Sequence, residues 1–113
     1  MTEITPNVVQ QMQNGTWRLA SPLAQNGKSL FAVTTNWCGH CKDLKQLYVP
    51  EAQLIEPFKF FYMDGEKSRA HENVSQALGV QGYPAVYKVG RNGTLTEYNG
   101  SRKPAQLARA INA

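Results

Sequence analysis

The chain of 113 residues contains two cysteines, Cys38 and Cys41, with two residues between them. On a helix, side chains at positions i and i+3 lie on one face, so the two sulfurs can close a short disulfide with little backbone movement. A dithiol that closes and opens in this way exchanges disulfides with other molecules through a mixed disulfide. Thiol–disulfide exchange is therefore the chemistry that these residues and their spacing favour.

The flanking segments place the pair at a junction between a strand and a helix. Residues 29–35 are dense in apolar and β-branched side chains, as a buried central strand would be, and residues 43–49 carry apolar side chains at helical spacing. Cys38 then lies at the helix N-terminus, where free backbone N–H groups and the helix dipole stabilise a thiolate, and protonated His40 adds a cation. We expect Cys38 to be the attacking sulfur and Cys41, one turn further along, to be the resolving sulfur.

Two other uses of the cysteine pair are less well supported. A structural zinc site needs about four nitrogen or sulfur ligands, and only His40 and His71 remain to complete one. His40 lies inside the loop and is badly placed to join, and His71 is expected on an exposed helix face. A purely structural disulfide across so short a loop would remove little chain entropy from the unfolded state. The residues therefore favour a redox-active pair that requires no metal and no organic cofactor.

The motif Trp37-Cys38-Gly39-His40-Cys41-Lys42 resembles the active site of protein disulfide isomerase domains, within the thioredoxin superfamily. Plain thioredoxins usually carry proline at the position of His40. The resemblance extends over residues 29–113 and implies the thioredoxin fold, an α/β fold with a central mixed β-sheet flanked by helices on both faces. It also makes Gly39 and His40 part of the catalytic motif, together with the two cysteines.

The pattern of elements along the chain predicts the same architecture. The length suits a single domain, residues 1–113, that can bury its own core. We expect Trp17, Leu19 and Leu23 to pack on this core, and Leu107 and Ile111 to face inward from the last helix. In order, the predicted elements are a short helix from Thr5 to Asn14-Gly15, a strand at 29–35, a helix at 38–55 kinked by Pro50, a strand at 58–63, a helix at 68–78 ended by Gly79, two hairpin strands at 85–89 and 95–98 around Asn92-Gly93, and a closing helix at 104–111.

Other residues take their roles from the resemblance. In related domains the proline that matches Pro84 is cis and lies against the cysteines, which exposes the backbone beside Tyr83 for a substrate strand to pair with. Trp37, Tyr83 and Pro84 would then shape the substrate groove. Arg102 matches an arginine thought to swing toward the resolving cysteine, where a cation would lower the pKa of Cys41. Without the motif upstream, Pro84 would be an ordinary turn proline and Arg102 a surface residue.

The sequence departs from the resemblance at Ala32. Most relatives place a buried Glu or Asp six residues before the first cysteine, as the proton acceptor for the resolving thiol. Disulfide isomerases pair that carboxylate with a Lys, which matches Tyr62 here. Both members of the buried pair are absent together, which is physically consistent because a lone buried charge is costly. We therefore expect resolution by Cys41 to be slow near neutral pH and to speed up as the pH rises.

Charge and hydropathy argue against several other classes of protein. The net charge is +4 and the pI about 9.2, but basic residues are scattered among acidic ones, so nucleic-acid binding is not predicted. The chain has no run of about 18 apolar residues, so no membrane span is predicted. The start, Met1-Thr2-Glu3, lacks the basic and apolar regions of a signal peptide. This predicts a cytoplasmic protein or, if the chain is a mature fragment with a new Met, one of the secretory lumen or periplasm.

These observations predict an enzyme, a protein thiol–disulfide oxidoreductase of the disulfide isomerase type. It would act as a monomer on protein substrates with disulfides or thiols, and with a redox partner such as a reductase, an oxidase or glutathione. The direction stays open, because it depends on the reduction potential of the pair relative to that of the compartment. His40 favours oxidation, whereas a reducing cytosol would favour a thioredoxin-type reductase. A non-catalytic binding module that uses the groove for recognition, or for a shared metal cluster, is the remaining alternative.

Overall fold

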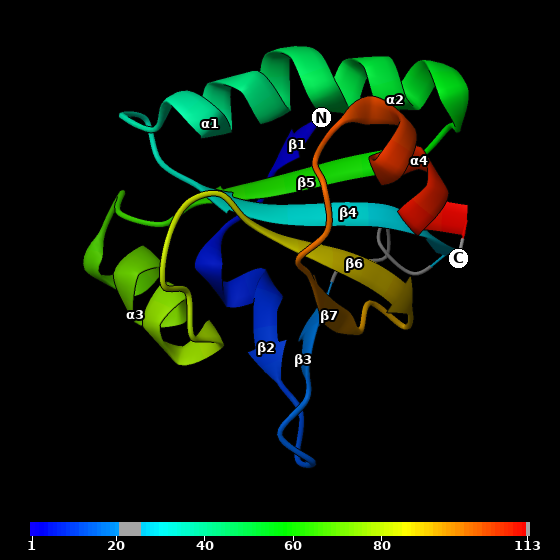
Figure 1. Ribbon diagram of the computed structural model, residues 1–113. Helices are drawn as coiled ribbons and strands as arrows, with labels where there is room; N and C mark the ends of the chain where they lie inside the picture. The colour runs from blue at the N-terminus through cyan, green and yellow to red at the C-terminus, as the bar shows by residue number, and fades with distance from the viewer. Residues whose placement is uncertain (21–25, 113) are drawn as a thin grey trace.

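The computed structural model describes residues 1–20 and 26–112 (Figure 1). Within these residues the strands are β1 (Thr2–Glu3), β2 (Val9–Gln11), β3 (Trp17–Leu19), β4 (Asn26–Thr34), β5 (Lys59–Asp64), β6 (Ala85–Arg91) and β7 (Leu95–Tyr98). The helices are α1 (Gly39–Asp43), α2 (Val49–Ile55), α3 (Arg69–Leu78) and α4 (Pro104–Asn112), with a 3₁₀ turn at Pro6–Val8 and a π-helical turn at Leu44–Tyr48.

A five-stranded mixed sheet forms the centre of the molecule, in the order β1-β5-β4-β6-β7. Strand β4 pairs in parallel with β5 and antiparallel with β6, and β7 completes a hairpin with β6. At the hairpin turn, Asn92 has φ 62° and Gly93 has φ 79°, the positive values for which an Asn-Gly pair is suited. The predicted central strand, the second buried strand and the hairpin are therefore confirmed.

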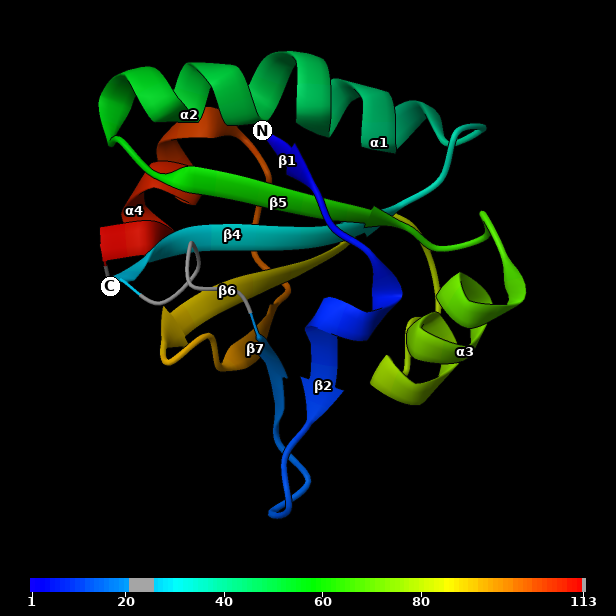
Figure 2. The same ribbon diagram turned by 180° about the vertical axis from the view of Figure 1, so that it is seen from behind.

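Helices cover both faces of the sheet (Figures 1 and 2). Because side chains alternate along a strand, β4 sends Leu30 and Ala32 to one face and Phe31 to the other. The first face packs against α2 and α4, and Leu107 and Ile111 of α4 are buried there, as predicted. The second face packs against α3 and the β2–β3 hairpin. This arrangement confirms the predicted α/β fold, with helices on both sides of a mixed sheet.

The N-terminal segment differs from its prediction. Instead of a helix to Asn14-Gly15, a 3₁₀ turn at Pro6–Val8 leads into β2, which pairs antiparallel with β3. Val9 is buried in this arrangement opposite Leu19, so a tertiary pairing of apolar side chains overrides the helix start signal. Trp17 and Leu19 pack on the core as predicted, whereas Leu23 lies outside the described residues.

The long helical segment after the cysteine motif begins at Gly39 and ends at Ile55, as predicted. The disturbance expected at Pro50 takes the form of the π-helical turn directly before it, in which Val49 N–H bonds to the carbonyl of Leu44. A proline cannot donate to the helix ladder, and its ring crowds the preceding turn, so a widened turn accommodates it. In Figure 2 the segment runs as one helical ribbon along the edge of the molecule.

Helix α3 and the segment after it bring the chain back to the cysteine motif. Ser68 caps the helix by accepting a hydrogen bond from the His71 N–H at 3.3 Å. Gly79 ends the helix at φ 81°, as predicted, because glycine adopts this left-handed conformation without steric cost. His71 was expected to be exposed but is half-buried, with its Nδ1 at 2.6 Å from Ser68 Oγ.

Candidate active site

Cys38 lies at the N-terminus of α1, where the sequence places it. Its sulfur accepts a hydrogen bond from the Cys41 N–H at 3.2 Å and so caps the helix. The Cys38 thiol also donates to the backbone carbonyl of Tyr83 at 3.5 Å. This contact brings residues 45 positions apart in the sequence together at one sulfur. The predicted position at the helix end is confirmed, and Cys38 is 5% exposed there.

Cys41 lies deeper in the protein and is 1% exposed. Burial and the hydrogen bond with Cys38 raise the pKa of the Cys41 thiol from 9.0 to about 12, while a backbone hydrogen bond with Thr35 and the charge of Lys45 act in the opposite direction. Both cysteines are free thiols, so the structure represents the reduced form of the pair. The chemical problem of this site is therefore to ionise a buried thiol at the resolving position.

Trp37 is a large apolar side chain beside the cysteines that is 69% exposed. Its Nε1 donates to Glu66 Oε1 at 2.7 Å, and its ring packs edge-on against Tyr83 with the centroids 5.9 Å apart. An exposed indole held on two sides presents a fixed apolar surface next to Cys38. The structure thus brings Trp37 and Tyr83 together, as the predicted substrate groove requires.

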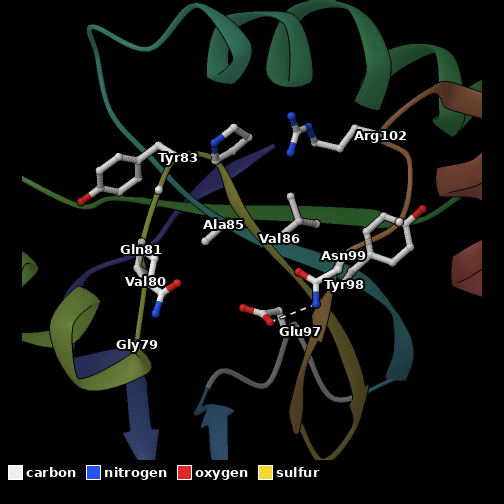
Figure 3. Close-up of a pocket in the computed structure, with 13 residues that line it drawn as sticks. Gly79, Val80, Gln81, Tyr83, Ala85, Val86, Glu97, Tyr98, Asn99 and Arg102 are labelled. Carbon is white, nitrogen blue, oxygen red and sulfur yellow. Dashed lines mark hydrogen bonds between the residues drawn. The ribbon is translucent and has the colours of Figure 1, made fainter.

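The turn that carries Tyr83 lies at the start of β6. The Tyr83–Pro84 peptide bond is cis, as the resemblance implied. Both residues line a cavity of about 490 Å³ that Arg102 also lines (Figure 3). Arg102 is half-buried and reaches this cavity from the segment before α4. The structure therefore gathers Arg102 with Tyr83 and Pro84.

Gly39 and His40 form the exposed first turn of α1, between the two cysteines. In this position the imidazole of His40 is open to solvent and to an incoming substrate. Among the described residues, no group of three or more His, Cys, Asp or Glu side chains comes together in a way that could hold a metal ion.

Ala32 and Tyr62 lie next to each other, as their sequence positions suggested. They are register partners on β4 and β5, and Ala32 pairs with Val86 of β6 on its other side. Lys45, from the π-helical turn above this face, holds its Nζ at 4.3 Å from the centroid of the Tyr62 ring. A cation–π contact therefore forms at Tyr62, the register partner of Ala32, where the resemblance had implied a buried ion pair.

A sequence model of the thioredoxin family matches residues 8–113. The chain belongs to the thioredoxin family. Among solved structures, human ERp44 in its zinc-bound form superimposes with a TM-score of 0.70 at 20% identity, over 99% of this chain and 31% of that one. Thioredoxin F from spinach chloroplast, in its short form, superimposes with a TM-score of 0.67 at 21% identity, over 98% of this chain and 89% of that one. These likenesses agree with the thioredoxin fold described above.

Curated relatives of this thioredoxin-family chain carry disulfide isomerase names. "Probable protein disulfide-isomerase ER-60" of Schistosoma mansoni is 38% identical over 64% of this chain, and "Protein disulfide-isomerase" of Drosophila melanogaster is 32% identical over 75% of it. The chain spans only 15% and 17% of the length of these two relatives. Together with the family match, they support thiol–disulfide oxidoreductase chemistry. None of the described helices is both long enough and apolar enough to cross a membrane.

Two residues of this thioredoxin site escaped the sequence analysis. Glu66 lies after β5 and contacts Trp37 across 29 positions, and no local pattern indicates such a contact. Lys45 follows Cys41 by four positions on the helical segment, and that spacing was the available signal, because side chains at i and i+4 are neighbours on a helix. Its contact with Tyr62 depends on the pairing of β4 with β5, which the spacing alone does not reveal.

Proposed function

We propose that this chain is a protein thiol–disulfide oxidoreductase of the disulfide isomerase type, which acts through Cys38 and Cys41. The observation that carries the proposal is the environment of Cys38. Its sulfur caps the helix against the N–H of Cys41 and at the same time contacts the carbonyl of Tyr83, beside the exposed Trp37. One sulfur is thus placed both to reach a substrate and to be reached by a second thiol.

The reaction has two exchanges that balance atoms and electrons. The Cys38 thiolate attacks one sulfur of a substrate disulfide, the substrate S–S bond breaks, and one substrate thiolate leaves. The Cys41 thiolate then attacks the Cys38 sulfur of the mixed disulfide, the bond from Cys38 to the substrate breaks, and the second substrate thiolate leaves. The substrate gains two electrons, the protein becomes the Cys38–Cys41 disulfide, and both substrate thiolates take protons from solvent. The same steps in reverse oxidise a substrate dithiol.

The surrounding residues would guide this exchange. Trp37, Tyr83 and Pro84 line the approach to Cys38, and an extended substrate segment can pair with the backbone at Tyr83. The Tyr83 carbonyl bonds to the Cys38 thiol in the reduced form, so it becomes free to accept a substrate N–H once that proton has left. Arg102 lies in the wall of the adjoining cavity, where a cation can act on the charge that passes between the two sulfurs.

The names of the curated relatives support the isomerase type. The direction in the cell follows from the reduction potential of the Cys38–Cys41 couple relative to the potential of its compartment. The measurement that decides direction is therefore an equilibrium of this couple with glutathione buffers.

Substitution of each cysteine tests the proposed roles. With insulin as the disulfide substrate, Cys41→Ser should accumulate a mixed disulfide through Cys38, because the first exchange proceeds and the second cannot. Cys38→Ser should form none, because the remaining thiol is only 1% exposed and its pKa is raised to about 12. The unaltered protein should catalyse insulin reduction by dithiothreitol, and both variants should lose that turnover. The proposal is wrong if insulin is trapped through Cys41, or if Cys38→Ser keeps turnover. A binding module that does not use its thiols would show no turnover even in the unaltered protein.

A further inference from the structure

The resolving thiol has few charged groups around it in the described part of the chain. On the sheet beneath it, β4 contributes Ala32, which is fully buried, and the neighbours of Ala32 are Tyr62 on β5 and the apolar Val86 on β6. From α4, the side chains that reach this face are apolar. No acidic side chain stands at the register positions beside Ala32, and the acidic residue on this face of β5 is Asp64, two positions after Tyr62, whose Oδ1 accepts the Glu66 N–H at 2.7 Å.

Lys45 is a cation that the helical segment places over this face. It is half-buried and lies one helical turn after Cys41, so both side chains leave the helix on neighbouring positions. Its Nζ lies 4.3 Å from the centroid of Tyr62, and the Tyr62 ring stacks in turn on Phe60 with the centroids 6.3 Å apart. A lysine in solvent samples many rotamers, whereas this one has an aromatic platform that limits where its charge lies.

The position of Lys45 matters because a buried thiolate is costly. Burial favours the neutral thiol, and a nearby positive charge favours the thiolate. Of the groups that act on Cys41, the neighbouring Cys38 works with burial and raises its pKa, whereas Lys45 and the backbone of Thr35 lower it. An ammonium group has no lone pair to accept a proton, so the proton of Cys41 must leave to water.

We propose that Lys45, positioned on the ring of Tyr62, is the cation that stabilises the Cys41 thiolate while it attacks the mixed disulfide at Cys38. This rests on the proposed function. In the step, Cys41 gives its proton to water, the new Cys41–Cys38 bond forms, and the bond from Cys38 to the substrate sulfur breaks. Lys45 exchanges no atom or electron. Its charge makes the attacking thiolate more abundant.

Other charged or titratable groups near the site act from different directions. His40 lies on the exposed turn between the cysteines, and Arg102 lies in the wall of the cavity beside Pro84. On β5, Tyr62 and Asp64 both lie on the face toward the helical segment; Tyr62 holds Lys45, and Asp64 Oδ1 accepts the Glu66 N–H at 2.7 Å. On the same face, Lys88 of β6 lies opposite Leu30, and Tyr98 of β7 lies opposite Val86. The test must therefore separate the charge of Lys45 from a general loss of positive charge.

A two-phase thiol assay, with the intact chain and the chromogenic disulfide DTNB, measures the attack by Cys41 separately from the attack by Cys38. In the first phase Cys38 attacks DTNB and releases one TNB anion, and in the second phase Cys41 displaces the other TNB anion from Cys38. Because the second phase depends on the thiolate of Cys41, its rate should rise about tenfold per pH unit below the pKa of that thiol. Lys45→Gln should lower the second-phase rate roughly tenfold at each pH, the effect of about one pKa unit from a nearby charge.

Matched variants make the result specific. Lys45→Arg should retain the fast second phase because it keeps the charge, and Tyr62→Phe should retain it because it keeps the ring. Tyr62→Leu should reproduce the loss, with little further loss when combined with Lys45→Gln. Lys42→Gln removes the same charge from an exposed position of the same helix and should have a much smaller effect.

The outcomes distinguish this proposal from the proposed function. If the first phase is absent from the unaltered protein, Cys38 is not the nucleophile and the proposed function fails. If the first phase is present but Lys45→Gln leaves the second phase unchanged at every pH, the role of Lys45 is overturned while the proposed function stands. An equal loss in Lys42→Gln, or a loss in Lys45→Arg as large as in Lys45→Gln, overturns it as well.

Discussion

At the scale of single residues, the two cysteines show how environment divides the roles of identical side chains. Cys38 caps a helix and contacts the Tyr83 carbonyl, whereas Cys41 is buried behind it with a raised pKa. The helix N-terminus stabilises negative charge at the first sulfur, and burial opposes negative charge at the second. Help for ionisation is therefore needed at Cys41, where burial acts against it.

The exposed imidazole of His40 should influence the redox balance of the pair. When protonated, it favours the thiolate of the reduced form, so the disulfide is easier to reduce. His40→Pro should therefore make the potential more negative by some tens of millivolts, at about 30 mV for each tenfold change in the equilibrium constant. Proline is tolerated at this position because the first turn of a helix has free N–H groups.

The measurement for His40→Pro is the fraction of oxidised protein in glutathione buffers of known ratio. His71→Asn is a suitable control, since it removes the other imidazole from a helix that does not carry the cysteines. An unchanged potential in His40→Pro would show that the helix terminus sets the redox balance without the imidazole.

At the scale of elements, the ends of helices position the site. The long helical segment presents Cys38 at its N-terminus, and its π-helical turn carries Lys45. On the other side, α3 ends at Gly79, from which a short segment leads to Tyr83 and Pro84. The long segment therefore acts on the site through its start and its π-helical turn, and α3 acts on it through its end.

The termination of α3 gives a prediction of stability. Gly79 has φ 81°, and a Cβ at this position would meet nothing within 4 Å, so the cost of a side chain comes from the backbone conformation alone. Gly79→Ala should lower the free energy of unfolding by about 1–2 kcal/mol, measured by urea denaturation.

Gly82→Ala is the matched control for Gly79→Ala. A Cβ at Gly82 also meets nothing within 4 Å, but φ at this position is not in the left-handed region. Its effect should stay within about 0.5 kcal/mol, as for ordinary surface substitutions. Equal losses in the two variants would contradict the attribution to φ.

At the scale of the whole molecule, the site is a meeting point of distant segments. The cysteine motif follows β4, Tyr62 comes from β5, Tyr83 precedes β6, and Arg102 precedes α4. The sheet brings them together because β4 lies between β5 and β6, with the helical segment across one face. Coupling between residues of different elements is therefore the property to measure at this scale.

Ala32→Glu should reveal such a coupling with Lys45. A carboxylate placed between Tyr62 and Val86 would be buried, and an uncompensated buried charge costs about 3–5 kcal/mol. Ala32→Glu should lower the free energy of unfolding less when Lys45 is present than when Lys45 is replaced by Gln. We expect the two losses to differ by at least about 1 kcal/mol, a coupling typical of contacting residues. The added carboxylate should also accept the proton of Cys41 and flatten the pH dependence of resolution.

The check is a double-mutant cycle by urea denaturation, together with the second phase of the DTNB assay against pH. Ala32→Glu with Tyr62→Lys supplies a charge partner from the adjacent strand and should lose less stability than Ala32→Glu alone. Strict additivity of Ala32→Glu and Lys45→Gln would contradict a shared environment for these two side chains.

Much of the fold followed from local sequence signals. The spacing of Cys38 and Cys41, the apolar runs of β4 and β5, Gly79 and the Asn92-Gly93 turn each act within a few residues, so they predicted elements that the structure confirms. The helix expected to reach Asn14-Gly15 was wrong, because Val9 gains more by burial against Leu19 on a neighbouring strand than by extending a short helix.

What the tertiary structure alone decided is which distant side chains act on the sulfurs. The sequence by itself determined the chemistry of the pair and its place at the start of a helix, since both depend on spacing. The burial of Cys38, the contact of Trp37 with Glu66 and the place of Lys45 over Tyr62 depend on how strands and helices pack. Contacts between residues far apart in the sequence depend on how all the elements pack together, and a local sequence pattern does not determine that packing.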